Sequence, residues 1–334
     1  MGRCRWDMTW RMKEKAVYIT RCDIGWYSRN ANAYRKPLEV ATKYDTTLYI
    51  CDGCRLPKEI EEKCANVVTF RHVGDILEQR HRVVGQCSKF NVFTGFDFPC
   101  MYVGWRLKRR YGCPWTVFLW DPPSLNHRDG FPPLRWAIDA MFRFFARRCD
   151  KLVLNIHPGL LEEIGFKPRA GQLELRMQDA WEGVDFGRTE WAGDKSFEYD
   201  FGILANWGVG KGGQFMAKAL GLMSGSKCLL IGDPPQGRAI AQMEFVGRLP
   251  QVEAFDRLRM CRVLVVPYLA TRAFRWNYPL KLFEYLQIGR PILASDNPGN
   301  ALVAERYSGR IELFRSGDVL DFVEKDKSML DRTR

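Results

Sequence analysis

Short apolar segments alternate with segments of helical periodicity along almost the whole chain. Six apolar runs in the first half predict strands, at 15–20, 46–53, 65–71, 89–95, 115–121 and 151–157. Three of the segments between them are long enough for a helix, at 31–44, 100–111 and 134–149. Parallel strands need crossovers of this length, so the pattern predicts a parallel sheet wrapped by helices.

The second half of the chain repeats the same pattern. It predicts strands at 199–206, 227–232, 243–249, 261–268 and 290–296, and helices at 211–223, 251–259, 280–288 and 300–307. A chain of 334 residues exceeds the usual size of one core, so we expect two doubly wound α/β domains.

The join between the two domains is predicted in the polar, aperiodic stretch 181–196, with domains at 1–186 and 187–334. In open parallel sheets, ligands bind at the carboxyl ends of the strands. Two such domains facing each other would form an interdomain cleft.

The composition excludes several classes of protein. With 46% hydrophobic and 27% charged residues, the chain is globular rather than disordered. It has no window of 18 apolar residues and no apolar leader, and its eleven cysteines form no regular framework. These features predict a cytoplasmic protein with reduced thiols. A single C-x-x-C, at Cys51 and Cys54, is weak support for a metal, and we expect no metal site.

The formal net charge of +12 is spread over both halves. It indicates an anionic partner, such as nucleic acid, an acidic lipid surface or a phosphate-bearing ligand, or simply a basic surface. The segment 134–149 is both apolar and rich in arginine. Its apolar residues at helical spacing predict a helix buried against a sheet, with attachment to a membrane surface as the alternative. These residues are Leu134, Ile138, Met141, Phe145 and Cys149.

A glycine-rich turn follows the first strand of the second half. The stretch "GVGKGG" (208–213) places glycines around Lys211, directly before a predicted helix. Glycines allow backbone N–H groups to approach an anion, and a helix start adds positive dipole. The turn therefore suits a phosphate, although a flexible loop explains it equally well.

The stretch "NYPLKLFEYLQIGRPILASD" (277–296) places a carboxylate in the middle of an apolar helix. Lys281 and Glu284 are three residues apart, so both side chains project from the same end of the helix. A lysine for a phosphate and a glutamate for two ribose hydroxyls would suit a sugar nucleotide. The alternative is a local ion pair, which contributes only ~0.2–0.5 kcal/mol.

These stretches, together with "VGRLPQVEAFDRLRMCRVLVVPY" (246–268) and "GVD" (183–185), resemble the donor-binding half of a known enzyme family. The family is the retaining nucleotide-sugar glycosyltransferases of the GT-B fold, related to sucrose and glycogen synthases. The resemblance covers most of residues 181–300. It is looser in the first half, where it rests on "FLWDPPSLN" and "CDKLVLNIHPGLLEEIGF".

The resemblance implies two Rossmann-like domains and transfer of a sugar from a nucleotide diphosphate sugar to an acceptor hydroxyl. It further implies retention of configuration and no metal or other cofactor. A UDP-sugar is the first choice of donor.

The resemblance also assigns roles to single residues. Glu284 matches the second glutamate of the family's E-x7-E motif, which holds the donor ribose, and Lys211 matches the lysine that neutralises the diphosphate. Trp276 stands where the first glutamate is expected, and no arginine partner of the Lys211 turn is present in "ILANWGVGK". The donor-binding residues expected in this way are Gly25, Lys211, Gly212, Arg248, Asn277, Lys281, Leu282 and Glu284.

Catalytic candidates, besides Lys211, follow a strand of the first half. Asp121 ends the apolar run "WTVFLWD", and His127 lies in the loop beyond it. Either side chain could orient the acceptor or handle a proton, although a solvated loop also explains His127. Weaker candidates are Arg21, Arg29, Asp129 and His157.

Two other functions are compatible with the sequence. Basic, aromatic segments at 105–115 and 142–149 permit DNA binding, so a phage-type glycosyltransferase acting on hydroxymethylated bases is one alternative. A catalytically inactive GT-B module that binds nucleotide or nucleic acid is the other, with Trp276 as its main support. The acceptor is then a glycan, a lipid-linked sugar or DNA. The location would be cytoplasmic, peripheral at a membrane, or an infected host cell.

Overall fold

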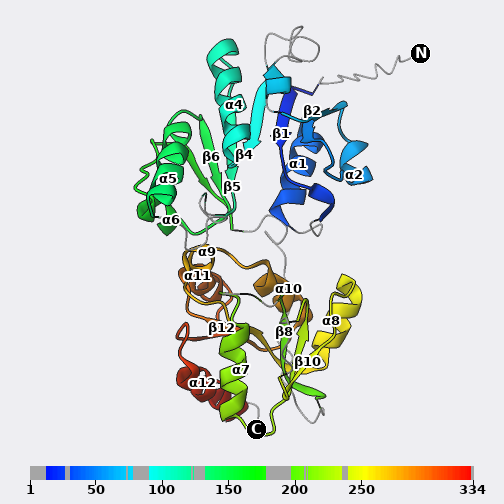
Figure 1. Ribbon diagram of the computed structural model, residues 1–334, viewed down its shortest axis with the longest axis vertical. Helices are drawn as coiled ribbons and strands as arrows, with labels where there is room; N and C mark the ends of the chain where they lie inside the picture. The colour runs from blue at the N-terminus through cyan, green and yellow to red at the C-terminus, as the bar shows by residue number, and fades with distance from the viewer. Residues whose placement is uncertain are drawn as a thin grey trace, which may run out of the picture. The chain divides into compact units, whose positions relative to one another are not determined.

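The computed structural model of the protein describes residues 13–26, 31–72, 74–77, 90–121, 123, 132–177, 197–206, 208, 210–234 and 240–331. The chain divides into two compact α/β units (Figure 1). The first comprises Met1–Leu119, Pro133–Val153 and Lys167–Glu174, and the second comprises Trp120–Pro132, Leu154–Phe166 and Leu175–Arg334. The predicted join at 186/187 lies outside the described residues.

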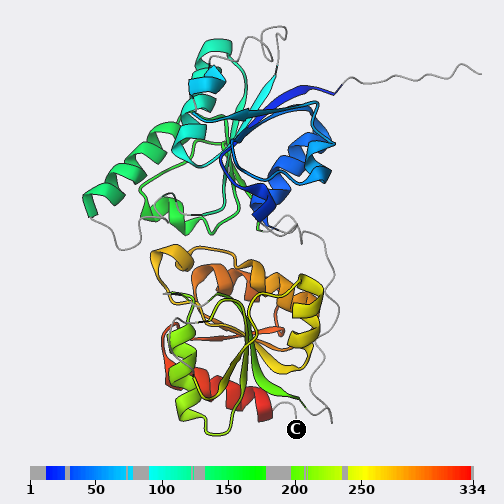
Figure 2. The same cartoon turned by 45° about the vertical axis from the view of Figure 1, so that its right-hand side comes forward.

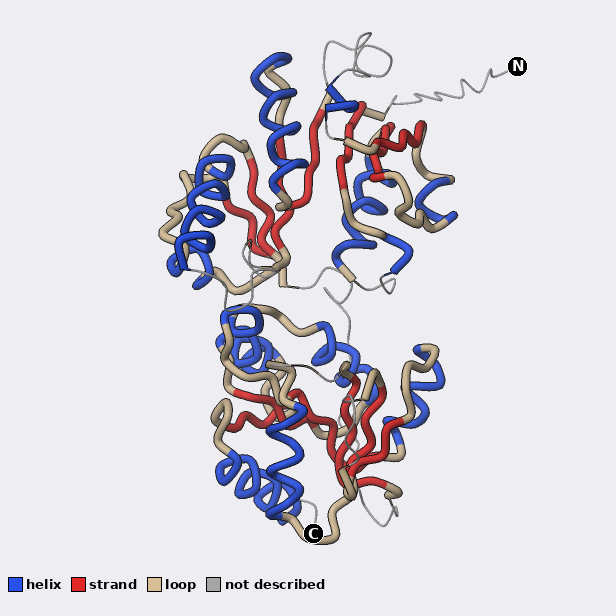
Figure 3. The backbone as a smooth tube through the Cα atoms, viewed as in Figure 1, coloured by secondary structure: helices blue, strands red, loops and turns tan. Residues whose placement is uncertain are grey.

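Seven strands form the sheet of the first unit, in the order β3-β2-β1-β4-β5-β6-β7. Figure 3 shows the strands of each unit in red and the helices around them in blue. They are β1 (Lys15–Thr20), β2 (Asp45–Cys51), β3 (Asn66–Phe70), β4 (Asn91–Gly95), β5 (Trp115–Leu119), β6 (Lys151–Leu154) and β7 (Leu173–Leu175). Strand β1 pairs in parallel with both β2 and β4. The strand order therefore reverses between β1 and β4, which is the switch point of a doubly wound sheet.

The helices between these strands include two long ones that pack against each other. They are η1 (Ile24–Trp26), α1 (Asn32–Lys43), α2 (Lys58–Glu61), α4 (Phe98–Tyr111), α5 (Pro132–Ala146) and α6 (Gly159–Glu163). The ring of Trp105 on α4 meets the rings of Phe144 and Phe145 on α5, at centroid distances of 5.8 and 6.2 Å. Helices α4 and α5 are therefore neighbours on the surface of the unit.

Six strands form the sheet of the second unit, and every neighbouring pair is parallel. In sheet order they are β10 (Met243–Phe245), β9 (Cys228–Ile231), β8 (Tyr199–Leu204), β11 (Cys261–Val266), β12 (Ile292–Ser295) and β13 (Ile311–Phe314). The helices are α7 (Gly213–Leu222), α8 (Gln251–Arg259), α9 (Arg272–Arg275), α10 (Leu280–Ile288), α11 (Pro298–Arg306) and α12 (Val319–Asp331). The order reverses between β8 and β11, as in dinucleotide-binding folds.

Side chains alternate between two hydrophobic layers in the second unit. Phe201 and Val263 pack in the layer with α7 and α12, whereas Leu264 and Val266 pack in the layer with α8 and α10. Figure 2 shows helices on both faces of this sheet. Because both faces are covered, the strands are apolar throughout rather than alternating with polar residues.

The structure confirms the predicted doubly wound α/β fold. Each predicted strand and helix is present, with ends that differ by a few residues, and α8 and α10 have the predicted bounds. The prediction for segment 134–149 is wrong in part, because Leu134 and Met141 are exposed while Ile138, Phe145 and Cys149 are buried. None of the helices in the described ranges is long and apolar enough to cross a bilayer.

Candidate active site

The glycine turn after β8 packs against the end of β11, at the switch point of the second sheet. Gly210 and Gly212 both have φ of +81°. A Cβ on Gly212 would lie 1.9 Å from the carbonyl oxygen of Pro267, and a Cβ on Gly210 would lie 2.9 Å from the ring of Phe274. The N–H of Leu269 donates to the carbonyl of Gly210 at 2.8 Å. Only glycine satisfies both the backbone angle and this close approach.

Lys211 therefore lies at the carboxyl edge of the sheet, directly before α7. Its side chain is half-buried, and its charge helps to lower the pKa of Asp233. No side chain caps the start of α7, where Gly212 occupies the N-cap. A lysine, a glycine turn and a helix start combine the features of a phosphate site.

Arg248 lies at the same edge and forms an ion pair with Asp233. Its Nε and Nη2 donate to the two carboxylate oxygens at 2.8 and 2.5 Å. This hydrogen bonding holds the pKa of Asp233 below its usual range. The predicted donor-binding role of Arg248 stays a prediction, and the contact that the structure shows is with Asp233.

Glu284 is nearly fully buried in α10, with 4% of its surface exposed. Its Oε2 is buried and accepts no hydrogen bond from any described residue. The Nζ of Lys281 lies 3.3 Å from this oxygen, as an ion pair within the helix. A buried carboxylate oxygen with spare hydrogen-bonding capacity is costly to a folded protein, and this oxygen has capacity to accept a hydrogen bond from a ligand.

The neighbouring residue Tyr285 fixes α10 to the switch point. Its hydroxyl oxygen accepts a hydrogen bond from the N–H of Leu204, at the end of β8, at 2.7 Å. The Glu284 helix is thus attached to the strand from which the glycine turn emerges. Leu282 is fully buried in the adjoining core, so its side chain packs there and leaves only its backbone for a ligand.

Trp276, at the position of the expected first glutamate, is a packing residue. Its ring stacks on His157, with centroids 5.3 Å apart and an interplanar angle of 19°. Its indole N–H donates to the carboxylate of Glu163. A Cβ on Gly159 would lie 2.2 Å from the ring, so the glycine makes room for it. Trp276 thus attaches the 157–163 segment to the loop before α10, within the second unit.

His157, a weaker sequence candidate, is held by the same packing. Its Nδ1 accepts a hydrogen bond from the N–H of Gly159 at 3.1 Å, and burial lowers its pKa. The imidazole is therefore neutral near neutral pH. Its stacking on Trp276 favours a structural role.

Asp121 and Asn277 meet although they are far apart in sequence. The Nδ2 of Asn277 donates to Oδ1 of Asp121 at 3.2 Å, and both residues belong to the second unit. Burial raises the pKa of Asp121 to about 7, against the opposing effect of the Asn277 hydrogen bond. Oδ1 of Asn277 is buried and has no hydrogen-bond partner among the described residues. The pair therefore combines a carboxyl that titrates near neutrality with an amide oxygen that can accept a further bond.

Other predicted site residues lie in the first unit or outside the described ranges. Gly25 donates its N–H to the carbonyl of Arg55 at 2.9 Å, and a Cβ there would lie 2.6 Å from the Cβ of Arg55. This close packing explains the glycine, and its contact with a donor phosphate stays a prediction. His127, a predicted catalytic residue, lies outside the described ranges, as do Arg29 and Asp129.

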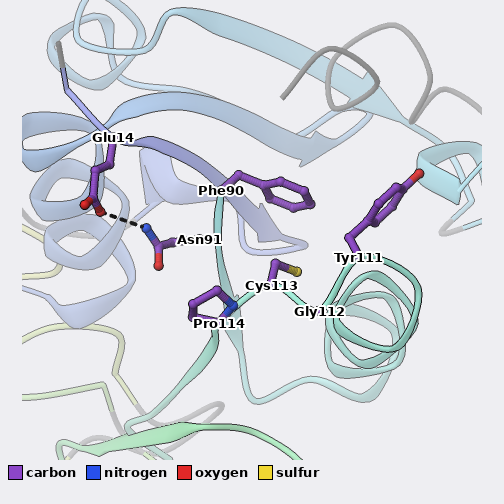
Figure 4. A pocket seen from close by; sticks show the side chains of 7 residues that line it. All are labelled: Glu14, Phe90, Asn91, Tyr111, Gly112, Cys113 and Pro114. Carbon is purple, nitrogen blue, oxygen red and sulfur yellow. Dashed lines mark hydrogen bonds between the residues drawn. The ribbon is translucent and has the colours of Figure 1, made fainter. Parts of the chain in front are cut away.

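A cavity of about 330 Å³ lies at the amino-terminal ends of strands in the first unit's sheet, at the edge opposite to their carboxyl ends. Figure 4 shows its lining, which includes Glu14 and Asn91 near the amino ends of β1 and β4. Parallel sheets bind ligands at their carboxyl ends, so this cavity is not the candidate active site. Within the described ranges, no group of three or more His, Cys, Asp or Glu side chains is placed to hold a metal ion.

Comparison with known protein families identifies the second half of the chain. Residues 200–332 match the family described as glycosyl transferases group 1. This range contains the glycine turn, Lys211, Lys281 and Glu284. No curated protein sequence matches the chain.

Solved structures share the fold over nearly the whole chain. The Anabaena protein HepE in complex with UDP-glucose has a TM-score of 0.66 at 13% identity, covering 96% of this chain and 90% of that chain. The lipopolysaccharide outer core galactosyltransferase WaaB has a TM-score of 0.63 at 12% identity, covering 96% and 91%. A UDP-N-acetylglucosamine 2-epimerase has a TM-score of 0.51 at 12% identity, covering 95% and 87%. Since transferases and an epimerase share this fold, the fold alone does not select the reaction.

Proposed function

From the premise that residues 200–332 form a group 1 glycosyltransferase domain, we propose that the protein transfers a sugar from a UDP-sugar to an acceptor hydroxyl. The proposal includes retention of configuration and no requirement for a metal. The observation that carries it is the buried Oε2 of Glu284, which accepts no hydrogen bond from the described residues and lies on a helix tied to the switch point. HepE, which is similar in fold, binds UDP-glucose, and this supports the choice of base.

The glycine turn would hold the diphosphate. The N–H groups at the start of α7 and the Lys211 ammonium would offer positive charge where the leaving group gains negative charge, whereas the N–H of Lys211 donates to the carbonyl of Gly208 within the turn. Such preorganised groups lower the barrier because they need no reorganisation during the reaction. Departure of a nucleoside diphosphate can then proceed without a covalent nucleophile or a metal ion.

Glu284 would hold the ribose. An ionised carboxylate accepts hydrogen bonds only, and the two ribose hydroxyls supply two donors. The ammonium of Lys281 lies 3.3 Å from the carboxylate and holds it in place. The apolar surroundings strengthen these bonds because water does not compete for them.

Asn277 and Asp121 would serve the transferred sugar and the acceptor. The unpaired Oδ1 of Asn277 can accept a hydrogen bond from a sugar hydroxyl. Asp121, with a pKa of about 7, can orient an acceptor hydroxyl or receive its proton. Asn277 and Asp121 would thus make the contacts to the sugar that the resemblance expects from a glutamate at position 276.

Thermal unfolding with a panel of nucleoside diphosphates tests the donor site. Saturation near 100 times the Kd adds ~2.7 kcal/mol of stability, which raises the Tm by roughly 5–10 °C. We expect UDP to give the largest rise. Glu284→Ala should reduce this rise, whereas Glu305→Ala, an exposed glutamate on α11, should not. Absence of a rise with every nucleotide would contradict the proposal.

A catalytically inactive module remains the second candidate, favoured by the packing of Trp276. In that case UDP binds, but a UDP-sugar is neither transferred nor hydrolysed. Release of UDP from UDP-glucose distinguishes the two, measured with and without glycan, lipid-linked and hydroxymethylated DNA acceptors. Turnover in any arm excludes the inactive module, and the arm that responds identifies the acceptor class.

A further inference from the structure

Helix α5 is apolar on its outer face as well as on its inner face. Ile138, Phe142 and Phe145 are buried against the first unit. The outer face carries large apolar side chains that are exposed, namely Leu134 (46%), Trp136 (68%), Met141 (41%) and Phe144 (40%). A helix that needed only to cover a sheet would have polar residues on this side.

Among the described residues, the charged groups that α4 and α5 expose beside this apolar face are positive, and the carboxylate of Asp150, after α5, is paired with Lys108. The only acidic residue on α4 or α5 is Asp139, which is buried. Exposed arginines are present on α4, on α5 and in the turn after α5: Arg106, Arg109, Arg135, Arg147 and Arg148. Arg109 lies over the ring of Trp105, and Arg106 lies over the ring of Tyr102, which contacts Trp105. Because Trp105 packs against Phe144, these two arginines of α4 belong to the same surface.

The arginines and the aromatic rings are interleaved. The guanidinium of Arg148 lies 3.5 Å from the centre of the Phe144 ring, and that of Arg109 lies 5.8 Å from the Trp105 ring. Lys108, by contrast, is already paired with Asp150. The surface therefore presents aromatic rings and guanidinium groups side by side.

We propose that this α4–α5 surface binds the face of an anionic lipid bilayer. Interfacial helices bury Trp, Phe and Leu at the boundary of the acyl chains while arginines contact lipid phosphates. Trp136 is the side chain best suited to this boundary, because its ring is apolar and its indole N–H can reach the headgroups. The protein would thus attach peripherally, at the surface of the bilayer.

Two other occupants explain the surface less well. A nucleic acid duplex would engage the arginines but would leave Leu134 and Met141 in water. A second copy of the chain would cover the apolar residues but would bring two sets of arginines together, and like charges oppose that pairing. A bilayer accounts for both the apolar and the basic residues.

Co-sedimentation of the full chain with vesicles tests the proposal. The vesicles are pure phosphatidylcholine, or an equal mixture of phosphatidylcholine and phosphatidylglycerol. We expect binding to the mixture, weakened by salt because the Debye length falls to about 3 Å at 1 M. Trp136→Ser with Met141→Ser should reduce partitioning roughly tenfold or more, since apolar burial drives insertion. Arg147→Gln with Arg148→Gln should weaken both the binding and its salt dependence.

The matched control removes equivalent apolar surface elsewhere. Val252 and Leu320 are 76% and 72% exposed in the second unit, and Val252→Ser with Leu320→Ser should leave vesicle binding unchanged. All the positions are exposed, so thermal unfolding should show intact folding.

Three results would overturn the inference. The first is that the wild type and the Trp136→Ser/Met141→Ser variant bind vesicles equally well. The second is that the protein binds a DNA duplex and does not bind vesicles. The third is that size-exclusion chromatography shows a dimer that becomes monomeric on the Trp136→Ser change. None of these depends on whether the UDP-sugar reaction occurs.

Discussion

Replacing Glu284 with methionine should change stability and nucleotide affinity in opposite directions. Methionine has a similar volume and helix propensity, so the substitution removes the charge without opening a cavity. In the free protein the carboxylate is 4% exposed, and one of its oxygens accepts no hydrogen bond from the described residues. We therefore expect Glu284 to reduce the stability of the free protein, which is the cost of the binding role proposed for it.

The magnitudes follow from these contacts. A buried polar atom without a partner costs about 1–3 kcal/mol. The ion pair with Lys281 offsets part of this, by about 0.5 kcal/mol for an i,i+3 pair. We therefore expect Glu284→Met to raise the free energy of unfolding by about 1 kcal/mol, or the Tm by about 2–4 °C. Loss of two hydrogen bonds to a charged group, at about 1.5 kcal/mol each, should weaken UDP binding roughly 100-fold.

Chemical denaturation gives the free energy of unfolding, and isothermal titration calorimetry gives the affinity for UDP. Glu305→Met on the exposed face of α11 is the matched control and should change neither. If Glu284→Met destabilises the free protein, the carboxylate is structural and the reasoning fails. If UDP affinity is unchanged, Glu284 does not hold the ribose.

Three further predictions concern the rest of the site. Lys211→Ala should weaken UDP binding about tenfold or more by calorimetry, because it removes a charge beside the diphosphate, whereas Lys218→Ala, at an exposed position on α7, should not. Gly159→Ala should lower the free energy of unfolding by about 1–3 kcal/mol in urea, because its Cβ would lie 2.2 Å from the Trp276 ring; a neutral result would mean that the ring moves freely. The raised pKa of Asp121, about 7, means that its contribution to stability is complete at low pH and is lost as the pH rises through 7. Asp121→Asn should remove that part of the pH dependence in denaturation titrations, and an unchanged profile would exclude the assignment.

Local patterns were sufficient to predict most of the fold. Apolar runs identified the strands because central parallel strands are buried on both faces, and α10 was predicted residue by residue. Glu284 stood out because a carboxylate within an apolar helix conflicts with packing, and such conflicts mark functional sites. Elements of four or five residues, such as α6 and α9, are too short to show a helical period and were missed.

Contacts between distant residues could not be predicted in this way. Asn277 was expected to serve the sugar and Asp121 the acceptor, but nothing local shows that the two form a hydrogen bond. The role of Trp276 depends on Gly159 and Glu163, which lie more than a hundred residues earlier. The outer face of α5 was misassigned because periodicity shows which residues align, not which side is covered. The sequence pattern therefore indicated where chemistry could occur, and the fold was needed to show which side chains meet.

The packing of Trp276 determines which fragments of the chain we expect to stay folded and soluble. The ring is covered by residues of the 154–166 segment, which the chain contributes to the second unit long before the rest of that unit begins. A fragment starting at residue 187 would contain all the residues that match the group 1 family, but it would leave one face of the Trp276 indole uncovered and Asn277 without its partner Asp121. We expect such a fragment to aggregate and to be poorly soluble. A fragment that also includes residues 115–166 should be more soluble. The region that matches the group 1 family is thus smaller than the compact unit to which it belongs.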